Sequence, residues 1–346
     1  MRRYEHGGDT YSCISVHLDF SVNINPFGLP IEVREAIISH ISEYQSYPDP
    51  SSRELCKKIA MREGLDPEDI LCGNGADDLI YRLCLSQKPK RTLLIAPTFS
   101  EYEKAALLSG SEIKYHRLHE KNDFALTEKI TEDIAENIDM VFLCNPNNPT
   151  GKMVEPELIE RILARCMAVG SILVIDECFL SFTDYGISSK ALLNDYKNLV
   201  ILDAFTKRYA MAGLRLGYII TKNRLLRDQV REFGQCWSVS AVAQEAGIAA
   251  LNCIDYQERA RCLIKKERRY LSESLAGLGF RVFLSSANYI LFRCQHPLVE
   301  PLLKKRILIR SCANYEGLDE SFYRVCVKKH EENEELIKAL TEVMHG

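Results

Sequence analysis

Short apolar runs alternate with amphipathic segments over much of the chain after residue 69. Seven runs rich in Val, Ile and Leu follow one another: DILCG, RTLLIAP, EIKYHRL, DMVFLCNP, SILVIDE, NLVILDA and LRLGYII. Continuous runs of this kind are typical of strands that are buried on both faces of a mostly parallel sheet. Residues 155–168 place apolar side chains at helical spacing between two of these runs. The pattern predicts an α/β domain over residues 45–235.

Different patterns flank this region. The first thirty residues are loop-like, and helices are predicted at 31–43 and 52–63, the second capped by Ser51 or Ser52 and ended by Gly64. Helical stretches cover 239–276, and ANYILFRC, RILIR and FYRVCV then predict strands, with helices at 296–305 and 330–344. We expect three parts: an N-terminal segment, 1–44, that joins the small domain, a large domain, 45–235, and a small α+β domain, 236–346.

Composition narrows the class of protein. The chain has 346 residues, 46% hydrophobic and 27% charged, with a net charge of −4, which argues against a nucleic-acid partner. Its 13 cysteines are scattered without C-x-x-C spacing, so no metal site is expected and a reducing compartment is favoured. The start, MRRYEHGGDTYSC, lacks a signal-peptide core, and no stretch is long and apolar enough to span a membrane. We expect a cytoplasmic protein.

Polar motifs follow several of the predicted strands, where α/β sheets bind ligands. CGNGADDL (72–79) places glycines before a helix, which makes either a phosphate cradle or an ordinary turn. APTFSEYE (96–103) supplies Phe99 and Tyr102, as a stacking platform or as core aromatics. CNPNNPTG (144–151) forms a rigid polar turn that presents Asn148.

Two further strand ends carry charges. Asp176 ends a hydrophobic run, where a carboxylate needs a partner: a salt bridge, a helix cap or a cationic ring nitrogen. In DAFTKRYAMAGLRLGY (203–218), Lys207 follows a strand and Arg215 lies eight residues later. A desolvated lysine amine forms Schiff bases with carbonyls, and an arginine fork suits a phosphate. Together the motifs favour a functional Lys207 over a surface charge.

These segments together resemble the fold-type I pyridoxal-5′-phosphate (PLP) enzymes, the aspartate-aminotransferase superfamily, almost from end to end. The resemblance implies a mostly parallel seven-stranded sheet sandwiched by helices, a smaller α+β domain, and a homodimer with active sites at the interface. It implies that Lys207 is the catalytic lysine that binds the cofactor. The other implied cofactor-binding residues are Gly75, Ala76, Asp77, Phe99, Asn148, Asp176, Thr206, Arg215 and, from the neighbouring subunit, Tyr47. Ala204 replaces a phosphate-binding serine of the family.

Within the superfamily the chain resembles two enzyme families, histidinol-phosphate aminotransferase and the L-threonine-O-3-phosphate decarboxylase of cobalamin biosynthesis. The opening HGG…LDFSVNINPFGLP and the stretch RILIRSCANYEGLDESFYRVCVK (306–328) favour the decarboxylase. Phe179 favours it too, since it replaces a tyrosine common in aminotransferases. The motifs YPDP and NPNNPTG occur in both families.

The decarboxylase resemblance implies a small phosphorylated amino acid as substrate and (R)-1-aminopropan-2-yl phosphate as product. Arg324 is then expected to bind the α-carboxylate and Arg310 the phosphate, with His6, Asn23, Asn25 and Asn148 as further substrate ligands. For Arg310, a strand-edge ion pair is the structural alternative. Transamination, serine phosphate as substrate, and a PLP-binding protein without catalysis remain open alternatives.

Overall fold

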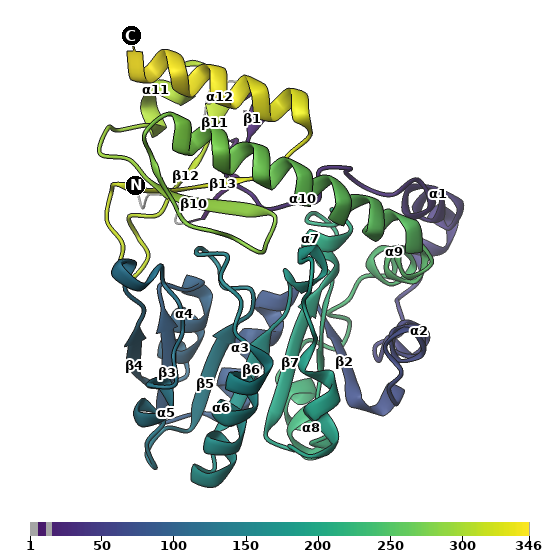
Figure 1. The fold of residues 1–346 in the computed structure, drawn as a ribbon. Helices are drawn as coiled ribbons and strands as arrows, with labels where there is room; N and C mark the ends of the chain where they lie inside the picture. The colour runs from purple at the N-terminus through teal and green to yellow at the C-terminus, as the bar shows by residue number, and fades with distance from the viewer. Residues whose placement is uncertain (1–5, 12–15, 346) are drawn as a thin grey trace.

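A seven-stranded sheet forms the centre of the larger part of the molecule (Figure 1). The computed structural model describes residues 6–11 and 16–345. The strand order is β2-β8-β7-β6-β5-β3-β4, and only β8 runs antiparallel to its neighbours. The strands are β2 (Ile70–Gly73), β3 (Arg91–Ala96), β4 (Glu112–Arg117), β5 (Met140–Cys144), β6 (Ile172–Asp176), β7 (Leu199–Ala204) and β8 (Gly217–Ile220). Each predicted run forms one strand, and the predicted fold class is confirmed.

Side chains of each central strand alternate between two hydrophobic cores, one on each face of the sheet. In β5, Val141 and Leu143 belong to one core, whereas Met140 and Phe142 belong to the other. Helices α2 (Arg53–Glu63), α6 (Pro156–Val169) and α9 (Ala241–Leu251) cover the first face; α3 (Ala76–Gln87), α4 (Ser100–Leu108) and α8 (Arg224–Glu232) cover the second. Burial of both faces explains why the strands are continuous apolar runs.

A smaller four-stranded sheet, ordered β12-β13-β10-β9, lies above the large sheet in Figure 1. Its strands are β9 (Arg281–Val282), β10 (Tyr289–Arg293), β12 (Arg310–Ser311) and β13 (Phe322–Cys326). Helices α10 (Ile254–Gly277), α11 (Val299–Lys304) and α12 (His330–His345) accompany it. Strand β1 (Leu18–Asp19) pairs in parallel with β11 (Ile307–Leu308), so the N-terminal segment lies beside the C-terminal strands. The division into three parts, with boundaries after residues 44 and 235, stays a prediction.

The remaining elements are short. They are α1 (Ile31–Ser39), α5 (Ile130–Asp133), α7 (Phe205–Arg208) and the 3-10 helices Ile41–Gln45, Pro67–Asp69, Glu120–Asn122, Leu180–Phe182 and Ser189–Asn194. The helix expected over 31–43 therefore ends at Ser39 and continues only as a 3-10 turn. Helix α2 follows Ser52 and ends at Gly64 as predicted, but its capping acceptor is the carboxylate of Asp49, which accepts from Arg53 N.

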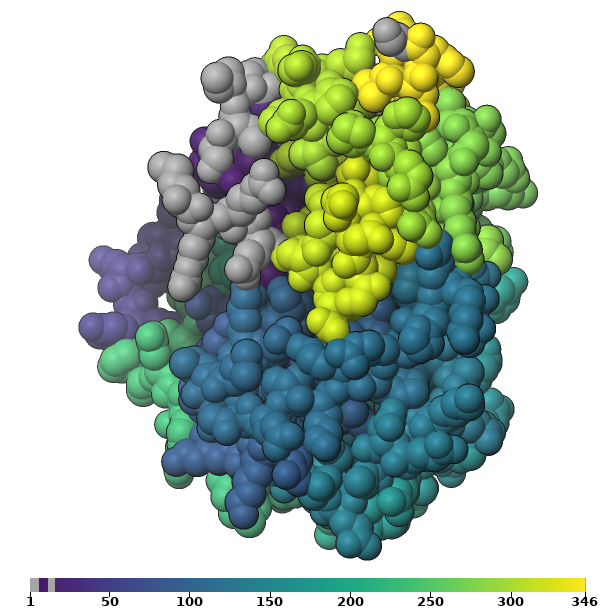
Figure 2. Space-filling model, turned by 90° about the vertical axis from the view of Figure 1, so that its left-hand side faces the viewer, coloured from purple at the N-terminus to yellow at the C-terminus, as the bar shows by residue number. Residues whose placement is uncertain are grey.

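The loop that follows β12 in the small sheet contacts the large domain near β4. Figure 2 shows the segment after β12, in yellow, lying on residues near β4, in blue; Arg117 and Glu316 form an ion pair there, 2.8 Å apart. None of the helices in the described ranges is long and apolar enough to cross a membrane. The described cysteines are all free thiols, and Cys13 lies outside the described residues.

Candidate active site

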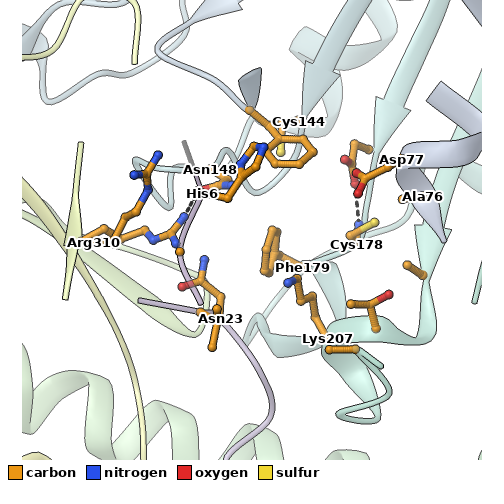
Figure 3. Close-up of a pocket in the computed structure, with 18 of the residues that line it drawn as sticks. His6, Asn23, Ala76, Asp77, Cys144, Asn148, Cys178, Phe179, Lys207 and Arg310 are labelled. Carbon is orange, nitrogen blue, oxygen red and sulfur yellow. Dashed lines mark hydrogen bonds between the residues drawn. The ribbon is translucent and has the colours of Figure 1, made fainter. Parts of the chain in front are cut away.

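A cavity of about 400 Å³ opens between the carboxyl ends of the large sheet and the small sheet. Its wall combines the N-terminal segment, the strand-end loops and strands β12 and β13. Figure 3 shows Lys207 between Arg310 on one side of the cavity and Asp77 on the other. Most of the residues predicted from the sequence line it: His6, Asn23, Ala76, Asp77, Phe99, Asn148, Asp176, Thr206, Lys207, Arg215, Arg310 and Arg324.

Lys207 extends into this cavity from α7, the short helix that follows β7. Burial lowers the pKa of its amine, and the positive charge of Arg324 lowers the pKa further. The neutral amine, which is the nucleophilic form, is therefore more abundant at neutral pH than in an exposed lysine.

Asp176 lies at the end of β6, 6% exposed, on the cavity wall. Its carboxylate accepts hydrogen bonds from the Tyr102 hydroxyl at 2.5 Å and from Cys178 N at 2.9 Å. Burial raises the pKa of Asp176, and these two neutral donors oppose the rise. A cation in the cavity beside Asp176 would favour the ionised carboxylate.

The N-terminus of α3 and Arg215 form a cradle at one end of the cavity. Gly75 has φ +86°, and a Cβ there would lie 2.7 Å from Nη2 of Arg215, so glycine allows the guanidinium to approach the helix start. Arg215 itself adopts a left-handed backbone, φ +57°, and pairs with Asp77 at 3.3 Å. Backbone N–H groups at a helix start and a guanidinium together favour an anion.

Two arginines form the opposite wall. Arg310 and Arg324 are direct partners across β12 and β13, and they are 8% and 5% exposed. Arg324 donates to Asn148 Oδ1 and, at 2.7 Å, to Ser21 O. Arg310 lies over the ring of Tyr315, 5.3 Å from its centroid. Both guanidinium groups lie on the cavity wall, and guanidinium groups bind carboxylates and phosphates, so this wall favours a ligand with negative charge.

His6 is held at the edge of the cavity by Glu101 of α4. Its Nε2 lies 2.6 Å from Glu101 Oε1, and its ring centroid lies 5.7 Å from that of Phe99. Glu101 also accepts from Lys104 Nζ at 2.9 Å and from the Tyr81 hydroxyl at 2.8 Å. The hydrogen bond from His6, with those from Lys104 and Tyr81, lowers the pKa of Glu101 to about 2.

Three predicted residues do not line the cavity. Gly75 lies behind Arg215 in the cradle. Asn25 is buried, and its amide donates to the backbone of α7. Tyr47 is 79% exposed and stacks on Trp237, with ring centroids 4.3 Å apart.

Sequence reasoning missed other residues of the wall. Tyr315 lies 3.5 Å from both Asn148 Oδ1 and Arg324 Nη1 and contacts Arg310, and Ser21 contributes the carbonyl that accepts from Arg324. Cys178 also lines the cavity. Tyr315 lies between Arg310 and Arg324 in the sequence, and this position could have indicated that it belongs to the same wall. No motif around Ser21 indicates its contact with Arg324.

The comparisons with known proteins agree with this geometry. The profile of the family "Aminotransferase class I and II" matches residues 15–340. Threonine-phosphate decarboxylase of Salmonella typhimurium is 36% identical over 99% of this chain and 97% of its own. Histidinol-phosphate aminotransferase from Clostridium acetobutylicum has a similar structure, with TM-score 0.88 and 33% identity over 94% of this chain and 99% of its own. The structure of L-threonine-O-3-phosphate decarboxylase from Porphyromonas gingivalis is also similar, with TM-score 0.83 and 27% identity over 95% of this chain and 100% of its own. The resemblance to fold-type I enzymes is thus confirmed, and the chain belongs to the aminotransferase class I and II family.

Proposed function

We propose that the chain is a PLP-dependent decarboxylase of a phosphorylated amino acid, specifically of L-threonine O-3-phosphate in cobalamin biosynthesis. The observation that carries the proposal is the pair Arg310 and Arg324, which face Lys207 across one cavity. A substrate with a carboxylate and a phosphate needs two cationic groups in the cavity, one for each anion. Its amino group reacts at the cofactor, which the cavity would hold beside Lys207. The similarity to a threonine-phosphate decarboxylase over nearly the whole chain supports this substrate.

The residues of the cavity fit PLP in three respects. The cradle of α3 and Arg215 suits the phosphate of the cofactor, with Thr206 beside it. Asp176 is a buried carboxylate whose hydrogen-bond donors in the protein are neutral. A protonated ring nitrogen of the cofactor would supply the positive charge that an ionised Asp176 needs as a partner. The lowered pKa of Lys207 suits a lysine that binds an aldehyde covalently.

When bound, the cofactor supplies an electron sink for the pair left on the substrate α-carbon. Arg324 would bind the α-carboxylate and so orient the bond that breaks. Arg310 binds the phosphate, with Asn23 and His6 at the same end of the cavity. Lys207 Nζ delivers the proton that replaces the lost carbon dioxide. Phe99 and Phe179 exclude water from this space; Phe179 is held by Tyr289, with ring centroids 5.0 Å apart.

We also propose that the enzyme is a cytoplasmic homodimer. Tyr47 is too exposed to serve the cavity of its own chain, which supports its use by a neighbouring subunit. The free thiols of the described cysteines fit a reducing compartment.

The test is incubation of the PLP-loaded protein with L-threonine O-3-phosphate while carbon dioxide and (R)-1-aminopropan-2-yl phosphate are measured. We expect stoichiometric formation of both, and at least a thousandfold loss in Lys207→Ala because the covalent attachment and the proton donor are removed. Lys57→Ala, on the exposed side of α2, is the control. O-phospho-L-serine in parallel shows what the methyl group contributes, which we expect to be about tenfold.

The structural similarity to a histidinol-phosphate aminotransferase favours a second candidate, transamination. Formation of glutamate from 2-oxoglutarate with histidinol phosphate as the donor, without carbon dioxide from threonine phosphate, would establish it. Loss of both activities in a protein that retains the cofactor would indicate a PLP-binding protein without catalysis.

A further inference from the structure

Helix α7, which carries Lys207, is too short to bond its own last carbonyl groups. It spans only Phe205–Arg208, and the chain turns away at Ala210, which has φ +54°. The carbonyl of Lys207 accepts from Ala210 N at 3.4 Å, but a helix of this length does not supply the donors from four residues onward that would bond the carbonyls of Lys207 and Arg208 in a longer helix. Carbonyl groups at a helix end are commonly bonded by partners from elsewhere in the fold.

Asn25 supplies these partners. Its side-chain Nδ2 donates to Arg208 O at 2.9 Å, and its backbone N donates to Lys207 O at 3.2 Å. Its Oδ1 accepts from Phe27 N at 3.1 Å, which fixes the orientation of the amide. The residue is 3% exposed and does not line the cavity. One residue of the N-terminal segment thus donates to both carbonyls at the end of α7, and at the Lys207 carbonyl it adds to the longer bond from Ala210 N.

The other side of α7 is anchored independently. The guanidinium of Arg208 forms an ion pair with Asp203 of β7, which also accepts from the Tyr218 hydroxyl at 2.9 Å. The position of Lys207 is therefore determined by the sheet on one side and by Asn25 on the other. Two residues before Asn25, Asn23 lines the cavity, and its Oδ1 is buried without a partner among the described residues.

We propose that Asn25 is a positioning residue: it caps α7, the helix that carries Lys207, and so holds Lys207 in place. Of the two asparagines, only Asn23 then binds the substrate. This assignment differs from the expectation that Asn25 is among the substrate ligands. It rests on the proposed function only in that Lys207 carries the cofactor. It does not depend on which bond of the substrate breaks.

The test compares Asn25→Asp and Asn25→Ala with Asn23→Ala in the PLP-loaded protein. Asn25→Asp keeps the acceptor for Phe27 N but replaces the donor by an oxygen that repels Arg208 O. Four quantities are measured: the rate of cofactor loss on dilution without substrate, the pH at which the absorption band of the lysine-bound cofactor titrates, and kcat and KM for threonine phosphate. Should Asn25→Asp fail to fold because it buries a charge, Asn25→Ala carries the test.

For both Asn25 variants we expect cofactor loss to be about fivefold to tenfold faster, as for one lost hydrogen bond, with a shifted band titration and a lower kcat. KM is expected to stay within about twofold, because the cavity wall is unchanged. Asn23→Ala is expected to raise KM and to leave the band titration unchanged. If the Asn25 variants instead raise KM and leave cofactor loss and the band titration as in the unsubstituted protein, Asn25 is a substrate ligand and the inference is wrong. An unsubstituted protein that shows no lysine-bound band would contradict the proposed function instead.

Discussion

The hydroxyl of Tyr102 donates a 2.5 Å hydrogen bond to Oδ2 of Asp176, and the tyrosine is fully buried. A similar pair lies elsewhere: the hydroxyl of Tyr218 donates to Asp203 at 2.9 Å, away from the cavity of Lys207. Both pairs join a tyrosine hydroxyl to a buried aspartate, but Asp203 also pairs with Arg208 and does not line the cavity. Comparison of the two pairs therefore tests what the hydrogen bond to Asp176 contributes inside the cavity.

Tyr102→Phe is expected to lower the free energy of unfolding by about 1–3 kcal/mol, as for a lost hydrogen bond to a buried carboxylate. It is also expected to reduce kcat, because the pKa of Asp176, already raised by burial, rises further and the ionised form is less populated. Tyr218→Phe should lower stability comparably but reduce kcat less, because the ion pair between Arg208 and Asp203 still anchors α7. Chemical denaturation and steady-state kinetics measure both, and equal kcat values for the two variants would contradict the role of Asp176.

Arg310→Gln should raise KM for threonine phosphate by about tenfold or more, since a charge-assisted hydrogen bond to the phosphate is lost. The effect on kcat should be smaller, because Arg310 does not hold the scissile carboxylate. Arg281→Gln, in the same sheet but 49% exposed, is the control. An unchanged KM in Arg310→Gln would show that the phosphate binds elsewhere.

The pH dependence of cofactor capture should report the charge of Arg324. Burial and Arg324 lower the pKa of Lys207, so removal of this guanidinium in Arg324→Met raises that pKa and leaves less neutral amine at pH 7. The rate at which the cofactor-free protein takes up PLP should then rise only at higher pH. Absorbance measured from pH 6 to pH 9 checks this. Arg310→Met, which also lines the cavity, should keep the original profile.

Glu101→Gln should weaken the placement of His6 without disturbing the cofactor. The pKa of Glu101 is about 2, so its negative charge is present throughout the working range, and the pairing with His6 is lost only in strong acid. We expect KM for threonine phosphate to increase about threefold to tenfold, as for one charged hydrogen bond. Glu103→Gln, on the same helix, is the matched control. A changed cofactor absorption in Glu101→Gln would contradict this view.

The free energy of unfolding should fall as pH rises from 4.5 to 7 because of Glu177. Burial raises its pKa from 4.5 to about 7, although Ser188 and the backbone of Ser189 donate to it. The folded protein then binds a proton that the unfolded chain has released, so this contribution is complete below pH 4.5 and is lost as pH rises to about 7. A shift of this size corresponds to roughly 3 kcal/mol at 1.36 kcal/mol per pH unit. Glu177→Gln should flatten the pH dependence of Tm in that range; an unchanged slope would assign the decline to other groups.

The strands and most of the cavity wall were predictable because both follow from local patterns. A run such as LVILD at 199–203 is apolar because both faces of the sheet are covered, and the polar residues after such runs meet at one edge. The contact of Asn25 with Arg208 was not predictable, since it joins residues 183 positions apart through a backbone carbonyl. Such a contact leaves no sequence pattern, and Asn23 and Asn25 look alike in the motif NINP.

Tyr315 and the break in RILIR were missed for a similar reason. The strand divides into β11, which pairs with β1, and β12, which pairs with β13, and this exchange of partners is a tertiary property. The division turns Arg310 toward the cavity and leaves Tyr315 in the loop beneath it.

The pairing of Leu18 with Ile307 joins the beginning of the chain to its last strands. During synthesis, β1 has no partner until Ile307 and Leu308 have been made, whereas the seven strands of the large sheet, which end at Ile220, are made earlier. Pairings so distant in sequence form late and slowly. The wall that contains Arg310 and Arg324 is therefore added to the cavity after the large sheet, so a partly made chain would offer the substrate no complete site.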